Sequence, residues 1–371
     1  MPDKKKVLLV HSTLHIGGAE EVSANICRRI DRDRFDVHVC FLKEKGVVAE
    51  KIEGEGTVVH AVARPNRDKP DYFTSWRLRR LIAREKFDLI HSHDVHSLMD
   101  GSVCRLTTPG LRHVHTFHYG NYPERAANFQ RIERATWRIP DRLVSVSEHQ
   151  REGVLQLYGM PPDRVQTVWN GVDVLAELPA EPTIGKYRAQ GRVVIGSVNT
   201  LIEQKGMPDL IKVAAKLKSM DVPPFVFLIA GGGPLQEELE REVERLGLQD
   251  VVEFLGWVKQ APQSVIPHID VFFQPSLWEA MSMVLLESMA LGRAIVATAV
   301  GETPRILDDG RHGRMLQPRD IDGMTAAMAS LLRDKELRER LGAEARQHYH
   351  DNFTARRLAE RHEILYEEVC S

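Results

Sequence analysis

The chain has few cysteines, and their positions exclude a framework of disulfide bonds. Cys27, Cys40, Cys104 and Cys370 are scattered over 371 residues, without the short spacings that disulfide-rich or zinc-binding sequences show. Unpaired cysteines are typical of proteins in a reducing compartment. We therefore expect a cytoplasmic protein without structural disulfides.

Long apolar runs are also missing. Three lysines precede the apolar segment Val7–Val10, which is shorter than the core of a signal peptide and is better explained as a first β-strand. No apolar run reaches the roughly 18 residues that a membrane-spanning helix needs. The sequence predicts at most peripheral contact with the inner face of a membrane.

A strong excess of either charge is absent. The net charge of −2 indicates no general affinity for nucleic acid. Residues 1–170 carry 27 Lys and Arg against 22 Asp and Glu, so the first half is the more basic one. Neither half contains the G-x-G-x-x-G fingerprint of dinucleotide-binding proteins, which removes the main support for a nicotinamide-dependent dehydrogenase.

The sequence does contain a regular alternation of strand and helix patterns. In the first half, short apolar runs typical of buried strands alternate with amphipathic segments typical of helices. The predicted strands are Lys6–Ser12, Phe35–Leu42, Thr57–Val62, Leu89–His93, His113–Phe117 and Arg142–Val146, and the predicted helices are Ala19–Ile30, Trp76–Arg84, Ser97–Arg105 and Glu124–Arg138. This alternation predicts an α/β protein with a parallel, doubly wound sheet.

The second half repeats the alternation after a Pro- and Gly-containing connection at Val174–Lys186. Its predicted strands are Val193–Ser197, Phe225–Ala230, Val251–Phe254, Val271–Phe273, Ala294–Thr298 and Met315–Gln317. A chain of 371 residues is too long for one ordinary core and suits two domains.

Two carboxylates are notable in Val271–Ala299, where a strand, a loop, a helix and a second strand follow one another. Glu287 lies on the predicted helix Ser282–Leu291 with apolar neighbours one turn away, and burial of a carboxylate costs several kcal/mol unless a partner replaces water. Glu279 lies in the preceding loop, at the end of a parallel strand, where α/β proteins bind ligands. A ligand, a buried arginine or the cap of a neighbouring loop would each explain the position of Glu287.

The spacing of Glu279 and Glu287, E-x7-E within SLWEAMSMVLLESMA, resembles that of retaining glycosyltransferases of the GT-B fold, and more narrowly family four, also called group 1. The resemblance implies two Rossmann-like domains with doubly wound parallel sheets, facing each other across a cleft. It places an acceptor-binding domain at residues 1–173, a linker at 174–190 and a domain that binds the nucleotide-sugar donor at 191–354. The C-terminal helix in 355–371 would join the first domain.

A lysine precedes one of the predicted helices of the second half. In Glu203–Asp209 (EQKGMPD), a lysine charge and free helix amides would act together on a phosphate, although a solvated surface lysine also explains the pattern. In the family that this sequence resembles, the motif Q-K-G carries the lysine that binds the donor diphosphate. The corresponding residues here are Lys205 and Gly206. The family usually has an arginine five residues earlier, where this chain has Thr200, and losing such a contact weakens phosphate binding by about 1.5–3 kcal/mol.

Glycine-rich turns follow several predicted strands. They allow a ligand to approach the backbone, but each is also explained as a tight turn without a ligand. By resemblance, Gly17 and Gly18 lie near the donor phosphate and the acceptor, and Gly232, Gly256 and Trp257 lie near the nucleotide. The segment 301–305 (GETPR) stands where the family more often has G-G-x-P-E, so the preference for donor sugar or acceptor can differ.

Histidines gather near the ends of strands in the first half. The segment His91–His96 (HSHDVH) suggests a metal site, but its aspartate comes one place early for the metallo-hydrolase pattern H-x-H-x-D-H, and we expect no metal. His93 and Asp94 are instead candidate acceptor contacts. A lone histidine such as His118 is commonly structural, whereas the resemblance places His118 beside the transferred sugar.

Two basic stretches, Trp76–Lys86 and Arg125–Arg142, lie in the first half. Most such runs are solvated faces of helices. On an acceptor-binding domain they would also suit an anionic acceptor or lipid headgroups.

The resemblance implies metal-independent, retaining transfer of a sugar from a UDP- or GDP-sugar to a saccharide, lipid-linked or small-molecule acceptor, with no cofactor besides this co-substrate. Glu279, Lys205 and His118 would be catalytic. Glu287 would hold the ribose, and the donor site would also include Thr200, Gly206, Ala280, Met281, Ser282 and Met283. A sugar phosphorylase of the same fold and a non-catalytic nucleotide-sugar-binding protein are the alternatives.

Overall fold

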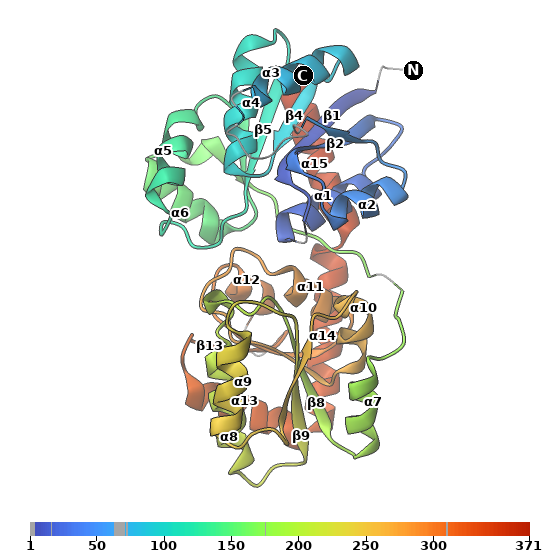
Figure 1. Cartoon of the computed structure of the whole chain (residues 1–371), viewed down its shortest axis with the longest axis vertical. Helices are drawn as coiled ribbons and strands as arrows, with labels where there is room; N and C mark the ends of the chain where they lie inside the picture. Colours follow the sequence, from blue (N-terminus) through green and yellow to red (C-terminus); the bar gives the residue numbers. More distant parts are fainter. Residues whose placement is uncertain (1–3, 16, 63–70, 72, 175, 309–310) are drawn as a thin grey trace. The chain divides into compact units, whose positions relative to one another are not determined.

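The computed structural model describes residues 4–15, 17–62, 71, 73–174, 176–308 and 311–371. The chain divides into two compact units, one formed by residues 1–172 and 355–371 and the other by residues 173–354. Each unit holds one parallel sheet covered by helices (Figure 1), so the predicted α/β class is confirmed. Ile16 of the predicted glycine loop and Leu175 of the predicted linker lie outside the described residues.

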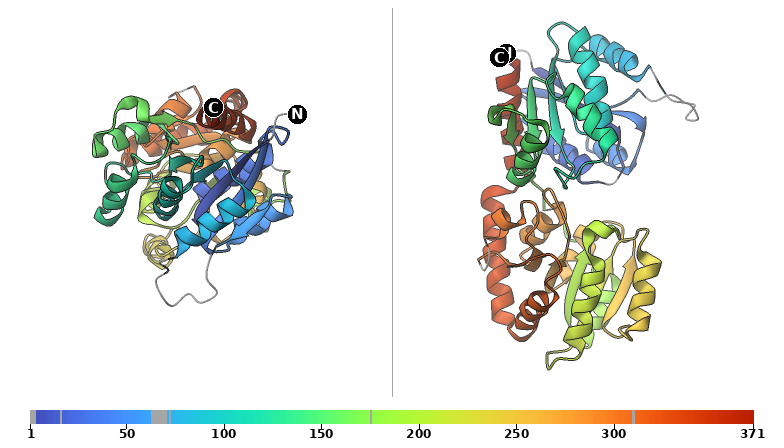
Figure 2. Two further views of the ribbon diagram at one scale, coloured as in Figure 1. Left: turned by 90° about the horizontal axis from the view of Figure 1, so that it is seen from above. Right: turned by 90° about the vertical axis from the view of Figure 1, so that its left-hand side faces the viewer.

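The first unit contains a seven-stranded sheet in the order β3-β2-β1-β4-β5-β6-β7, with parallel pairing throughout. Helices α1, α2 and α15 cover one face, and α3, α4 and α5 cover the other (Figure 2). In chain order the elements are β1 (Lys5–Thr13), α1 (Gly18–Arg29), β2 (Phe35–Glu44), α2 (Val47–Gly54), β3 (Val59–Ala61), α3 (Thr74–Glu85), β4 (Leu89–Ser92), α4 (Val95–Thr107), β5 (Arg112–Phe117), α5 (Ala127–Thr136), β6 (Arg142–Ser145), α6 (Glu148–Tyr158), η1 (Pro162–Arg164), β7 (Val165–Thr167) and α15 (Ala355–Cys370).

The second unit contains a six-stranded parallel sheet in the order β10-β9-β8-β11-β12-β13. Helix α8 packs against α9 and α13, and α11 packs against α10 and α14. The elements are α7 (Pro182–Ala189), β8 (Val193–Val198), η2 (Glu203–Lys205), α8 (Met207–Lys218), β9 (Phe225–Ala230), α9 (Gln236–Arg245), β10 (Val252–Gly256), α10 (Ala261–Ser264), η3 (Ile266–His268), β11 (Val271–Gln274), α11 (Met283–Ala290), β12 (Ala294–Thr298), α12 (Thr303–Leu307), β13 (Arg314–Leu316), α13 (Ile321–Arg333) and α14 (Lys335–Asn352). No helix among the described residues combines the length and the apolar character needed to cross a membrane.

The central strands are continuous apolar runs because helices cover both faces of each sheet. In β1, which pairs with both β2 and β4, the residues Val7–Val10 are fully buried. In β9, all six residues of FVFLIA are buried. A parallel sheet with two covered faces requires such runs instead of an alternation of apolar and polar residues.

The predicted linker at 174–190 is wrong in its second half, where the structure has helix α7. The helix begins at Pro182, whose fixed φ suits a first turn, and the carboxylate of Glu181 accepts a hydrogen bond from the backbone N–H of Thr183 at 2.8 Å. Within this helix, Ile184 and Tyr187 are buried. The proline therefore marks the start of a helix here. The sequence patterns also miss α2, α6 and β7.

Gly206 joins η2 to α8 with a φ of 64°, in the left-handed region. A Cβ atom at this position would lie 1.9 Å from the backbone oxygen of Pro275. The loop after β8 therefore lies directly against the loop after β11, and only glycine permits this approach.

We predict that Gly206→Ala destabilises the second unit more than Gly247→Ala does. Gly247 has a similar φ of 62°, but its Cβ would meet no atom within 4 Å. Alanine at Gly247 therefore costs only the left-handed conformation, about 1–2 kcal/mol. Alanine at Gly206 adds an overlap with backbone, for a further loss of about 1–3 kcal/mol or more. Urea denaturation of both variants measures the difference, and equal losses would contradict the contact.

Candidate functional site

The carboxyl ends of the parallel strands in the second unit bring several loops together. The loop after β11 is bonded to the loop after β8, because the backbone N–H of Leu277 donates to the carbonyl of Gln204 at 2.7 Å. It is also bonded to the loop after β12, where the N–H of Glu302 donates to the carbonyl of Ala280 at 3.0 Å. Ligands of α/β proteins bind at this edge of the sheet.

The shortest ion pair at this edge joins two of the residues predicted to be catalytic. Nζ of Lys205 lies 2.5 Å from Oε1 of Glu279, although 74 positions separate them in the sequence. The Glu279 side chain is only 7% exposed and that of Lys205 is 21% exposed, so the pair is largely shielded from water. Ser276 donates to Oε1 of Glu279 at 2.9 Å, and Gln204 donates to Oε2 at 3.3 Å. Three donors thus fix the orientation of this carboxylate.

Glu287 lies in the middle of α11, and Glu279 lies in the loop directly before this helix. The hydroxyl of Ser282 caps this helix by accepting from the N–H of Leu285 at 3.3 Å, and it donates to Oε1 of Gln274 at 2.6 Å. Glu287 is half-buried, and its Oε2 atom is buried. The carboxylate is therefore partly withdrawn from bulk water, which agrees with the apolar neighbours seen in the sequence.

The other predicted donor-site residues differ in exposure. Ala280, Met281 and Ser282 are buried, and Met283 is half-buried. Gly232 and Gly256 are half-buried, whereas Thr200 is exposed and Trp257 is 65% exposed. Within the described residues, no side-chain hydrogen bond or ion pair links Thr200 or Trp257 to the Lys205–Glu279 pair. The structure thus brings together Lys205, Gly206, Glu279 and Ala280, and leaves Thr200 and Trp257 at the surface of this unit.

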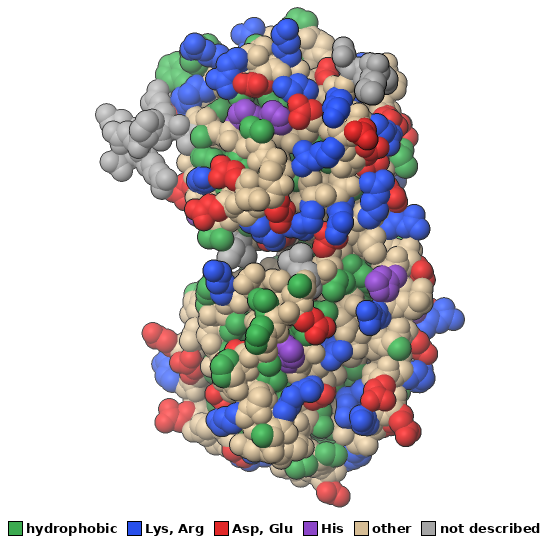
Figure 3. Space-filling view, turned by 90° about the vertical axis from the view of Figure 1, so that its right-hand side faces the viewer, with side chains coloured by type: hydrophobic (Ala, Val, Ile, Leu, Met, Phe, Trp, Pro, Cys, Tyr) green, Lys and Arg blue, Asp and Glu red, His purple; other side chains and the backbone are tan. Residues whose placement is uncertain are grey.

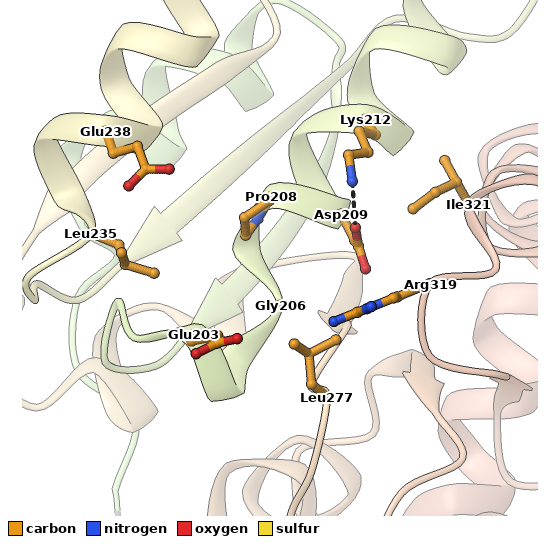
Figure 4. A pocket seen from close by; sticks show the side chains of 10 residues that line it. All are labelled: Glu203, Gly206, Pro208, Asp209, Lys212, Leu235, Glu238, Leu277, Arg319 and Ile321. Atoms are coloured by element: carbon orange, nitrogen blue, oxygen red, sulfur yellow. Dashed lines mark hydrogen bonds and ion pairs between the residues drawn. The ribbon is translucent and has the colours of Figure 1, made fainter.

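A hollow of about 440 Å³ opens at the start of α8 (Figure 4). On its wall, Nζ of Lys212 and Oδ1 of Asp209 form an ion pair at 3.0 Å. Its lining residues are Glu203, Gly206, Pro208, Asp209, Lys212, Leu235, Glu238, Leu277, Arg319 and Ile321. The hollow shares Gly206 with the predicted donor site, but neither the Lys205–Glu279 pair nor Glu287 lines it.

In the first unit, Asp94 organises the ends of β1 and β4. Its Oδ1 accepts from the N–H groups of His96 and Ser97, which caps α4, and from the hydroxyl of Ser12 at 2.6 Å. Its Oδ2 accepts from the N–H of Ser12 at 2.6 Å. Burial opposes ionisation, but these hydrogen bonds outweigh it, so the pKa of Asp94 is lowered. Asp94 therefore has a structural role that the sequence does not reveal, and its predicted acceptor contact stays a prediction.

The glycine loop after β1 carries an acidic side chain that the sequence patterns miss. Gly17 has an extended backbone, and a Cβ atom there would lie 2.4 Å from Oε2 of Glu20. Burial raises the pKa of the Glu20 carboxyl, and the negative charge of Asp94 adds to the effect. A carboxylate over Gly17 opposes the binding of a phosphate by the loop Gly17-Gly18 unless it moves or is protonated.

The structure brings the predicted residues His93 and His118 together, with Nδ1 of His93 3.0 Å from Nε2 of His118. They belong to a cluster of histidines from β1, β4, β5 and α15. Burial lowers the pKa of each member: to about 4 for His11 and His362, to about 3 for His113 and His118, and well below the usual value for His91, His93 and His115. These rings are neutral at pH 7. Among the described residues, no group of three or more His, Cys, Asp or Glu side chains has the arrangement of a metal site.

The two predicted basic stretches differ in structure. On α3, Arg79, Arg80 and Arg84 are exposed. Arg125, by contrast, pairs with the buried Glu133 at 3.2 Å and stacks 4.3 Å from the ring centroid of Tyr119. On the face of the molecule drawn in Figure 3, basic and acidic side chains are interspersed, as on an ordinary solvated surface.

Sequence reasoning missed two residues that hold Glu279, namely Gln204 and Ser276. Gln204 belongs to the Q-K-G motif, and its Nε2 also donates to the carbonyl of Trp278 at 3.0 Å. The motif was a usable signal for Gln204. Ser276 has no such signal, because its contact depends on the turn of the loop after β11.

Known protein families match the chain in two segments, one in each half. The family described as Glycosyltransferase Family 4 matches residues 16–174, and the family described as Glycosyl transferases group 1 matches residues 183–348. The phosphatidyl-myo-inositol mannosyltransferase of Mycolicibacterium smegmatis is 31% identical over 280 residues, which are 75% of this chain and 70% of that protein. The UDP-Gal:alpha-D-GlcNAc-diphosphoundecaprenol alpha-1,3-galactosyltransferase of Escherichia coli is 24% identical over 351 residues, covering 90% and 89% of the two chains.

Solved structures show the same fold. Anabaena Alr3699/HepE, solved in complex with UDP and glucose, aligns with a TM-score of 0.84 at 20% identity and covers 98% of this chain and 100% of that chain. Two Rossmann-like units with doubly wound parallel sheets place this protein in the GT-B class of fold. Within that class, the chain belongs to the group 1, or family 4, glycosyltransferases, and it is therefore a sugar-transferring enzyme.

We predict that the histidine cluster makes the first unit sensitive to acid. Because the folded pKa values are lowered, the unfolded chain takes up protons first as the pH falls below about 6.5. The free energy of unfolding is thus unaffected above that pH and decreases between about pH 6.5 and pH 4. The four histidines with folded pKa values of about 3 to 4 would together cost roughly 4–6 kcal/mol per pH unit.

Urea denaturation at pH 7.5 and 5.5, followed by far-UV circular dichroism, measures this loss. His362→Phe removes one of the titrating groups and serves as a control, since it would reduce the pH slope by about 1.4 kcal/mol per pH unit. Equal stability at the two pH values would contradict the prediction.

Proposed function

We propose that this glycosyltransferase is a retaining enzyme that transfers a sugar from a UDP- or GDP-sugar to a saccharide, lipid-linked or small-molecule acceptor without a metal ion. The observation that carries the proposal is the shielded Lys205–Glu279 pair at the strand ends of the second unit, followed by Glu287 on α11. The UDP in the HepE structure and the UDP-Gal donor named for the Escherichia coli relative support a nucleotide sugar as donor.

Each proposed role follows from the charge and position of a side chain. Lys205 precedes α8, so its ammonium and the positive end of that helix's dipole would act together on the leaving diphosphate. Glu279, held by Ser276 and Gln204, has the geometry to accept hydrogen bonds from hydroxyl groups of the donor sugar. Glu287 would accept hydrogen bonds from the ribose hydroxyls, which would replace the water it loses on partial burial.

The acceptor would bind to the first unit, with His118 beside the transferred sugar. The exposed arginines Arg79, Arg80 and Arg84 on α3 would suit an anionic acceptor or a peripheral contact with the cytoplasmic face of a membrane. Vesicle flotation with and without anionic lipid tests this contact, and absence of binding to both kinds of vesicle would remove it from the proposal.

Thr200 supports a second candidate, a weakly active member of the family that mainly binds a nucleotide sugar. Thr200 is exposed and offers one hydroxyl where the family usually has a guanidinium. A transfer assay with UDP-, GDP- and ADP-sugars, with and without EDTA, separates the two functions. We expect transfer to a saccharide acceptor with one donor class, unchanged by EDTA and with retained anomeric configuration by NMR. Donor binding with little transfer would favour the second candidate, and dependence on phosphate alone would favour a sugar phosphorylase.

We further predict that Glu287→Ala abolishes the protection that the nucleotide gives against thermal unfolding. Without the carboxylate, the ribose loses charge-assisted hydrogen bonds worth about 1.5–3 kcal/mol, which corresponds to an affinity about 10- to 150-fold lower. A thermal-shift titration with UDP and GDP measures the effect. Glu237→Ala, an exposed glutamate on α9 of the same unit, is the matched control and should keep the full shift. An unchanged shift in Glu287→Ala would remove its assigned role.

A further inference from the structure

Three hydrogen bonds join His118 to the interior of the first unit. Nε2 of His118 lies 3.0 Å from Nδ1 of His93, and Nε2 of His93 lies 3.4 Å from the hydroxyl of Ser23. The same hydroxyl lies 2.8 Å from Nε2 of His11. The His11 and His93 rings are stacked with their centroids 4.6 Å apart and their planes within 4°. The four residues come from β1, α1 and the ends of β4 and β5, and together they form a relay of defined order.

Each ring in the relay carries a single N–H group. Burial lowers the pKa of His11, His93 and His118 far enough to keep all three neutral at pH 7. A neutral imidazole has one donor nitrogen and one acceptor nitrogen, and the hydroxyl of Ser23 has one proton to donate. If the hydroxyl of Ser23 donates to one of the two rings that it contacts, it must accept from the other, and the direction of the hydrogen bond between His93 and His118 then follows.

The distances favour one of the two possible directions. An O–H donor forms shorter hydrogen bonds than an N–H donor. The 2.8 Å contact is therefore the one in which Ser23 donates to His11, and in the 3.4 Å contact Nε2–H of His93 donates to Ser23. Nδ1 of His93 then has no proton and accepts from Nε2–H of His118.

This direction leaves Nδ1 of His118 as an acceptor. His118 is half-buried, in contrast to the fully buried rings behind it, so part of its side chain can meet a ligand. No group among the residues that the structure describes forms a hydrogen bond with Nδ1 of His118. A hydroxyl group is the part of a sugar that such a nitrogen recognises, because it supplies the missing proton donor.

We propose that His93, Ser23 and His11 are positioning residues that hold His118 in the Nε2–H tautomer, so that its Nδ1 accepts a hydrogen bond from a substrate hydroxyl. The effect on catalysis rests on the proposed function, whereas the tautomer itself does not. The inference also gives His93 a role different from the acceptor contact predicted from the sequence, since both of its ring nitrogens are engaged within the protein.

The test is the tautomer of His118, read from the ring nitrogen shifts of the full-length, ¹⁵N-histidine-labelled protein at pH 7.5. The wild type should show Nε2 protonated and Nδ1 unprotonated. His11→Phe keeps the stacked ring but removes the acceptor of Ser23, which then donates to His93 and drives His118 towards the Nδ1–H tautomer. Ser23→Ala breaks the relay in the middle and should give a mixture of tautomers.

Ser92→Ala is the matched control. Ser92 is as deeply buried as Ser23 and also contacts two histidines, His113 and His115, each at 2.9 Å, but it has no link to His118. This variant should leave the His118 signals unchanged. An Nδ1–H tautomer in the wild type, or identical His118 signals in wild type, His11→Phe and Ser23→Ala, would overturn the proposal.

Transfer kinetics test the effect on catalysis separately. Ser23→Ala should lower kcat about fivefold, the equivalent of one ordinary hydrogen bond, and change the KM for the donor by less than that, because most of the proposed donor contacts belong to the second unit. Ser92→Ala should leave both constants unchanged. A changed tautomer with an unchanged kcat would overturn the catalytic part of the proposal. If the wild type transfers no sugar, the proposed function fails, and the nitrogen shifts still decide the tautomer.

Discussion

The ion pair between Lys205 and Glu279 is the constraint on which the second unit's candidate site depends. A carboxylate that is 7% exposed is stable only with partners, and here an ammonium, a hydroxyl and an amide supply them. Removing one member of such a buried pair typically costs roughly 3–5 kcal/mol, because the other charge is left unpaired. The loops after β8 and β11 are therefore fixed by the same groups that are proposed to bind the donor.

The two units use different electrostatics at the ends of their strands. The second unit keeps opposite charges in contact. The first unit buries histidines, and burial lowers their pKa values so that the rings stay neutral. No charge is then buried, but each buried N–H group needs an acceptor. An ion pair persists when the angle between its two groups changes. In a chain of hydrogen-bonded neutral rings, each donor must meet an acceptor, so all the hydrogen bonds point the same way along the chain. For this reason a hydroxyl such as that of Ser23 can control a ring two hydrogen bonds away.

The sequence predicted those parts of the fold that depend on local pattern. Strand β9 was recognisable because burial on both faces of a parallel sheet requires continuous apolar residues. Helix α7 was missed because its proline was taken as a break, although the proline stands at a first turn. The contact of Gln204 with Glu279 spans 75 positions and depends on how two loops cross. No spacing rule gives such a contact, and the same holds for the relay that starts at His11.

The ion pair also limits how the proposed donor can bind. In the structure, the charge of Lys205 is already balanced by Glu279, so a diphosphate would meet an ammonium that has a partner. With Thr200 in place of the usual arginine, the remaining attraction comes from the N-terminal end of α8, where the helix dipole is positive. Sugar hydroxyls that donate to Glu279 would replace the ammonium as its partners and free Lys205 for the phosphate. Binding of the sugar and of the diphosphate would then be coupled, and a nucleotide without its sugar would bind Lys205 less well than the intact donor.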